Sequence, residues 1–119
     1  MMMPGPVELP PAMAPPEVDC SVNAGWYPLL VRLHRQLSTV TDDFTYVQIK
    51  EKFGVLRCYV NYGDSIDDFT RGICELLIDA SVEESSTICE LCGRRGRLRT
   101  GNGRIRTACE SCFPGADVQ

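Results

Sequence analysis

The stretch CELCGRRGRLRTGNGRIRTACESC, residues 89–112, decides how the C-terminal part of this chain folds. It contains two C-x-x-C pairs, Cys89 with Cys92 and Cys109 with Cys112, and 16 residues separate the pairs. This spacing is typical of a zinc site with four thiolate ligands. Because four cysteines complete the tetrahedral shell of Zn(2+) and leave no position for water, we expect one structural zinc ion per chain. Two disulfides or redox-active C-x-x-C pairs are the alternatives.

The residues between the two pairs predict a β-hairpin that is rich in arginine. The sequence G-N-G at residues 101–103 is a strong turn signal between two short segments, 97–100 and 104–107. Alternation places the arginines on one face and the apolar residues on the other. Arginine makes bidentate contacts with phosphate and carboxylate, so this face is a candidate surface for nucleic acid or a partner. Docking on the acidic part of the same chain and a role in solubility are the alternatives. The candidate residues are Arg94, Arg95, Arg97, Arg99, Arg104 and Arg106.

The middle of the chain predicts a helix followed by an antiparallel β-hairpin. The helix begins near Gly25, and its apolar face steps by three and four residues. That face consists of Trp26, Leu30, Leu33, Leu37 and Val40. Residues 44–53 and 55–62 predict two strands with a turn at Gly54. One face of the first strand is expected to hold Thr45, Val47, Ile49, Glu51 and Phe53.

Three basic residues near this turn form a second candidate surface. Lys50 and Lys52 point to the same side of their strand, and Arg57 follows the turn. Phe53 either lies exposed beside them or packs under the first helix. The sequence therefore predicts a charged hairpin tip with one aromatic side chain, which can contact a partner or nucleic acid.

A second helix is expected from Ser65, with an N-cap signature formed with Asp68, to about Ser85. Its predicted apolar face consists of Ile66, Phe69, Ile73, Leu76, Leu77 and Ala80. Carboxylates occupy the other positions, and Asp67 and Asp68 in the first turn suit the helix dipole. The predicted fold class is therefore α+β: helix, antiparallel β-hairpin, helix, followed by a C-terminal zinc ribbon.

Composition divides the chain into three parts. Six of the eight prolines lie within the first 16 residues, so residues 1–24 are expected to form a disordered or extended tail. Residues 25–87 form the expected α/β body and residues 88–113 the four-cysteine ribbon. Residues 1–87 hold 6 basic and 13 acidic side chains, a net charge of −7, whereas residues 88–112 hold 6 arginines and 2 glutamates, a net charge of +4. The expected molecule is an acidic body with an arginine-rich tip.

The same composition argues against several classes of protein. The chain has no long apolar run and no secretory leader pattern, and its seven cysteines are an odd number. We therefore expect a cytoplasmic protein that does not contact a membrane. No nucleotide-binding motif is present, and a closed zinc shell cannot activate water. His34 is the only histidine. An enzyme is thus not expected, and neither is a small-molecule substrate. Cys58 and Cys74 are interpreted as small buried hydrophobic residues, and Cys20 in the tail as a thiol that is either reactive or without a role.

Three segments resemble one family of proteins: GWYPLL (25–30), VQIKEKFGVLRCYV (47–60) and CELCGRRGRLRT (89–100). The chain is similar to small uncharacterised bacterial and prophage proteins that combine a G-W-x-P-L-L helix start, a V-Q-x-K-E-K-F-G-x-L-R hairpin and a C-terminal cysteine ribbon. The resemblance covers about 85 residues, roughly from the first helix onward. It implies a phage context and no known reaction.

These observations predict a non-enzymatic, zinc-stabilised binding protein that docks on a nucleoprotein or nucleic-acid-processing complex. The expected partner is a protein or nucleoprotein complex. One alternative is direct nucleic-acid binding through the arginine-rich ribbon. Another is a phage inhibitor of host defence, similar to an anti-CRISPR protein, in which the acidic second helix mimics DNA.

Overall fold

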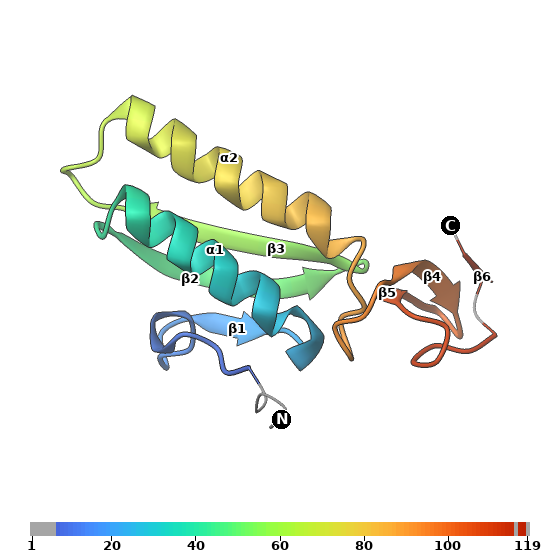
Figure 1. The fold of residues 1–119 in the computed structure, drawn as a ribbon. Coiled ribbons are helices and arrows are strands. Elements are labelled where there is room, and N and C mark those ends of the chain that lie inside the picture. Colours follow the sequence, from blue (N-terminus) through green and yellow to red (C-terminus); the bar gives the residue numbers. More distant parts are fainter. Residues whose placement is uncertain (1–6, 116, 119) are drawn as a thin grey trace, which may run out of the picture.

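The computed structural model describes residues 7–115 and 117–118, and in it the chain forms a mixed α+β fold with two helices and two small sheets (Figure 1). The first sheet has the strand order β1-β2-β3 and the second has the order β5-β4-β6. The helices are α1 (Tyr27–Val40) and α2 (Asp68–Ser85), and short 3-10 turns lie at Pro11–Met13 (η1) and Ala24–Trp26 (η2). The strands are β1 (Asp19–Ser21), β2 (Phe44–Lys52), β3 (Val55–Tyr62), β4 (Arg97–Gly101), β5 (Arg104–Ala108) and β6 (Asp117–Val118).

The two helices lie on one face of the first sheet, and the opposite face is left open (Figure 1). The core therefore lies between the helices and the sheet. The predicted apolar face of α1 is confirmed, because Trp26, Leu30, Leu33 and Leu37 are buried and Val40 packs against them. Burying each such side chain contributes about 1.5–3 kcal/mol. The C-terminal segment, residues 88–113, is here named the cysteine lobe, and it lies at the end of the sheet where β2 turns into β3 (Figure 1).

A β-bulge shifts the face pattern of β2. Tyr46 pairs with Val60 and Gln48 pairs with Tyr59, so Val47 is left between them without a partner. The predicted single face from Thr45 to Phe53 is therefore wrong. Before the bulge the inward residue is Tyr46, which is buried, and after it the inward residue is Ile49, which is fully buried. Val47 is exposed on the open face of the sheet.

The predicted buried face of α2 is correct for Leu77, which packs against the core, and wrong for Phe69 and Leu76. Phe69 and Leu76 are 77% and 71% exposed. The buried positions are instead Cys74, Ile78, Ser81 and Ser85. The small side chains among them, Cys74, Ser81 and Ser85, let α2 pack against α1 and β3, and the Ser85 hydroxyl accepts a hydrogen bond from the Leu56 N–H at 3.1 Å. Apolarity alone favours the Phe and Leu face, because it takes no account of the close packing that Ser and Cys allow.

The N-cap of α2 differs from the prediction as well. Asp67 is the capping residue, and its carboxylate accepts a hydrogen bond from the Thr70 N–H at 2.7 Å. Ser65 bonds to the Asp43 carboxylate instead, which connects the loop after β3 to the start of β2.

Residues 7–24, expected to be disordered or extended, form η1, the extended strand β1 and η2. β1 pairs in parallel with β2, with Asp19 beside Gln48 and Ser21 beside Lys50. Met13 is fully buried in the core. The proline-rich segment is therefore part of the body, because Leu9, Val18 and Val22 also pack against the core. Residues 1–6 lie outside the described part of the chain.

Candidate metal centre and the junction around it

The four predicted ligands meet at one point. Their sulfur atoms all lie within 4.8 Å of one another. The Sγ atoms of Cys92 and Cys109 are 3.6 Å apart. A tetrahedron with metal–sulfur bonds of about 2.3 Å has edges of about 3.8 Å, which is close to this spacing. The four thiols can therefore hold a metal ion, and all seven cysteines of the chain are free.

Two similar turns aim the thiols inward. The N–H of Gly93 donates to the carbonyl of Cys89 at 2.9 Å, and the N–H of Phe113 donates to the carbonyl of Cys109 at 3.1 Å. Gly93 has φ of 82°, which glycine adopts without strain. The backbone N–H of Cys112 also donates to the Cys109 sulfur and lowers the pKa of that thiol to about 7. A thiolate is the form that binds a metal.

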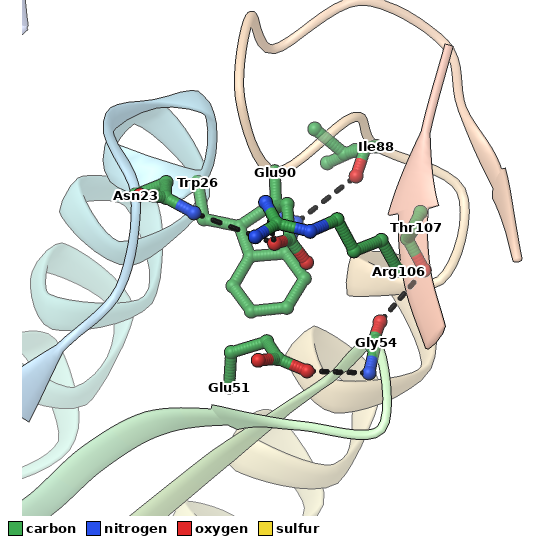
Figure 2. Close-up of polar contacts among 8 residues, drawn as sticks. All are labelled: Asn23, Trp26, Glu51, Gly54, Ile88, Glu90, Arg106 and Thr107. Atoms are coloured by element: carbon green, nitrogen blue, oxygen red, sulfur yellow. Dashed lines mark hydrogen bonds and ion pairs between the residues drawn. The ribbon is translucent and has the colours of Figure 1, made fainter. Parts of the chain in front are cut away.

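The first cysteine turn packs directly on the start of α1 (Figure 2). The Gly25 N–H donates to the Glu90 carbonyl at 2.9 Å, and the indole N–H of Trp26 donates to the Ile88 carbonyl at 3.0 Å. A Cβ atom at Gly25 would lie only 2.3 Å from the Cys89 carbonyl oxygen. Glycine is therefore required here for close approach of two backbones.

Glu90 is buried at the centre of this junction, with 1% of its surface exposed (Figure 2). Its Oε1 atom accepts hydrogen bonds from Arg106 at 3.2 Å and from Asn23 at 3.3 Å. Its Oε2 atom has no hydrogen-bond partner within the described chain. Burial, and then the nearby Glu51 carboxylate, raise the pKa of Glu90, whereas Arg106 lowers it. Arg106 therefore stabilises the fold, because removing its side chain would leave the buried Glu90 carboxylate without a counter-charge.

The β2–β3 turn forms the other side of the junction. Phe53 and Gly54 both have positive φ, and the Gly54 N–H donates to the Glu51 carboxylate at 2.6 Å. The Gly54 carbonyl accepts a hydrogen bond from the buried Thr107 hydroxyl at 2.7 Å (Figure 2). The hairpin tip is thus fixed against β5 of the cysteine lobe. The sequence patterns do not identify Glu90 or Thr107, since both resemble ordinary surface residues in the sequence.

The six arginines of the cysteine lobe divide into two groups. Strand register places Arg97, Arg99, Arg104 and Arg106 on one face of the β4–β5 pair, as the alternation predicts. Arg106 binds Glu90, and the Arg99 Nε donates to the Ala108 carbonyl at 2.7 Å. The remaining four are exposed and make no ion pair within the described chain: Arg94, Arg95, Arg97 and Arg104.

The two predicted basic groups meet at the junction. Phe53 is 63% exposed, so the alternative in which it packs under α1 is wrong. The Lys52 ammonium lies 5.8 Å from the centre of the Phe53 ring. Phe53 also lines a hollow of about 230 Å³ together with Glu51 of β2 and with Arg104, Ile105 and Arg106 of β5. The exposed Phe53 ring therefore lies beside Lys52 of the hairpin tip and Arg104 of the cysteine lobe.

His34 lies away from this surface, beside another hollow of about 580 Å³. Its Nδ1 atom is 2.7 Å from the Tyr46 hydroxyl. Burial lowers the pKa of His34 and raises the pKa of Tyr46. The hydrogen bond between these neutral groups satisfies a polar atom of each inside the fold.

No family model, curated protein or solved structure matches this chain. No helix in the described ranges, residues 7–115 and 117–118, has both the length and the apolarity that crossing a membrane requires.

Proposed function

We propose that this chain is a zinc-stabilised binding protein, not an enzyme, that contacts nucleic acid as part of a nucleoprotein complex. One observation carries the proposal: two exposed basic side chains from distant segments, Lys52 of the hairpin and Arg104 of the cysteine lobe, lie beside the exposed Phe53 ring at the junction. Soft thiolate donors in a closed tetrahedral set favour Zn(2+) over the other common metals, and such a site stabilises structure. The metal would hold the cysteine lobe in the shape that presents its arginines.

The charge distribution supports this proposal. The body is acidic overall, yet Lys52 and Arg57 at the hairpin are exposed without an ion pair among the described residues, as are four arginines of the lobe. Arginine and lysine on one surface supply the electrostatic part of phosphate binding. The resemblance to prophage proteins would place this activity in phage or host nucleic-acid processing in the cytoplasm.

The test is the salt dependence of binding to a labelled oligonucleotide. The zinc-loaded chain should bind, and the logarithm of its affinity should fall linearly with the logarithm of the salt concentration. Replacing Arg94, Arg97 or Arg104 with Ser should weaken binding and reduce the slope by about 1 for each phosphate that the variant no longer neutralises. Arg71→Ser, on the exposed side of α2, is the matched control. Unchanged affinity in all three lobe variants would contradict the proposal.

The outer side of α2 suggests a second candidate function, contact with a protein partner. Phe69 and Leu76 lie two turns apart on this exposed face, and Asp68, Glu75 and Asp79 lie along one side of it. Exposed apolar side chains beside carboxylates fit a protein with an apolar and basic surface. This face fits a DNA mimic less well, because large apolar groups interrupt its charges. An inhibitor of host defence could still use it.

This second candidate is tested by affinity purification from host cells. A host protein that the tagged chain binds should no longer co-purify with the Leu76→Asp or the Phe69→Asp variant. The same host protein should still co-purify with the Val47→Asp variant, which adds a charge at an exposed valine on the opposite layer. Equal recovery with all variants would show that α2 does not bind it.

A further inference from the structure

The open face of the first sheet carries two like charges directly opposite each other. Lys50 of β2 pairs with Arg57 of β3, so their side chains leave the sheet on the same face. Like charges at directly opposite positions destabilise a sheet. Neither side chain makes an ion pair or a hydrogen bond with another described residue. The fold therefore contains an unfavourable pair that an anionic ligand would relieve.

A second pair of the same kind shows the contrast. Arg99 and Arg106 are directly opposite each other in the β4–β5 pair. There, however, Arg106 binds the buried Glu90 carboxylate, and Arg99 donates to the Ala108 carbonyl. Both members of this like-charge pair thus have a partner within the chain, whereas Lys50 and Arg57 on the open face have none among the described residues. On the open face the strand residues include one carboxylate, Asp19, which accepts a hydrogen bond from Gln48 at 3.0 Å.

Aromatic rings flank the unneutralised pair. Tyr59 lies on the same face as Arg57, two residues further along β3, and is 53% exposed. At the other end lies Phe53, with Lys52 over its ring. A strand rises about 3.3 Å per residue, so Tyr59 is roughly 13 Å beyond Val55 at the start of β3. Exposed aromatics and basic side chains therefore alternate along the sheet toward the cysteine lobe.

We propose that this open face, together with the hairpin tip, is a binding site for single-stranded nucleic acid. Lys50, Lys52 and Arg57 bind phosphates, and bases stack on Tyr59 and Phe53. Stacking on an exposed ring needs a free base face, which a single strand offers and a duplex does not. Arg104 extends the track onto the cysteine lobe beside the hollow that it lines with Phe53 and Arg106. The Glu51 carboxylate also lines this hollow, where it accepts a hydrogen bond from the Gly54 N–H. This inference rests on the proposed function and specifies the nucleic acid that it takes.

The test is fluorescence anisotropy with labelled 15-mers of dT and U and with a duplex of equal length, using the zinc-loaded full chain. Both single strands should bind at least about tenfold more tightly than the duplex. Tyr59→Ala and Phe53→Ala should each weaken single-strand binding about tenfold, whereas Tyr59→Phe keeps the ring and should bind as the unmodified chain does. Phe69→Ala removes a still more exposed ring from α2 and should leave single-strand binding unchanged. Zinc content and the thermal midpoint confirm that each variant is folded.

The outcomes separate this inference from the proposed function. Equal affinity for duplex and single strand, with no effect of Tyr59→Ala or Phe53→Ala, would overturn the single-strand site. If Arg94, Arg97 or Arg104 variants still weakened that binding, the proposed function would stand. Absence of binding to every oligonucleotide at low salt would overturn both. Loss of binding in Phe69→Ala to the same extent would show a general destabilisation and overturn the stacking role.

Discussion

Removing the metal, or replacing Cys109 with Ser, should unfold the cysteine lobe and detach it from the body. A structural zinc site contributes about 10–16 kcal/mol of apparent binding free energy in zinc-finger peptides at neutral pH. The lobe has little core of its own to replace this, because its two strands are five residues each. The expected zinc content is about one ion per chain before the change and close to none after it.

Trp26 makes this unfolding easy to follow. It is the only tryptophan of the chain, it is fully buried, and its indole N–H donates to Ile88 at the start of the lobe. Unfolding of the lobe should therefore shift tryptophan emission to longer wavelength and open residues 93–108 to proteolysis. Cys20 lies outside the cluster of four thiols, so the Cys20→Ala variant should bind the metal and show the same emission spectrum as the unmodified chain. A purified chain without metal whose four thiols form disulfides would contradict the zinc site.

The sequence predicted the parts of the fold that local patterns determine. The cysteine spacing identified four thiols that meet in space, and the 3.6-residue period identified the buried face of α1. Turn chemistry located the two hairpins at Gly54 and at residues 101–103. In each case a few neighbouring residues carry the whole signal, so no knowledge of the tertiary structure is needed.

The rest depends on contacts between distant segments. The bulge at Val47 reverses which residues of β2 face the core, and no single residue type predicts the position of a bulge. Three of the four buried residues of α2 are small, Cys74, Ser81 and Ser85, and their burial depends on how α2 packs against α1 and β3. The candidate surface follows the same rule. Its basic residues were visible in the sequence, but their meeting at Phe53 depends on how the hairpin tip packs against β5.

Gly25→Ala should destabilise the whole chain by about 3 kcal/mol or more, which is the upper end of the cost of overpacking. The added methyl group would lie 2.3–2.5 Å from three backbone atoms of Cys89 and Glu90. Those atoms cannot rotate away as a side chain can, because Cys89 is also expected to bind the metal. The hydrogen bond from the Gly25 N–H to the Glu90 carbonyl would break when the two backbones separate. Metal binding and docking of the lobe should therefore weaken together.

Gly72→Ala is the matched control, since it makes the same chemical change in the opposite environment. Gly72 lies inside α2, and a Cβ there meets no atom within 4 Å. Alanine in an exposed helix interior stabilises by about 0.5–1 kcal/mol relative to glycine. The urea concentration at the midpoint of unfolding should thus fall for zinc-loaded Gly25→Ala and rise for zinc-loaded Gly72→Ala, relative to the unmodified chain. Trp26 emission of the folded protein should shift to longer wavelength in Gly25→Ala alone. Unfolding of the two variants at the same urea concentration would contradict the close contact between Gly25 and the cysteine turn. The cysteine lobe would then not be packed against the body, and the two could not form one binding surface.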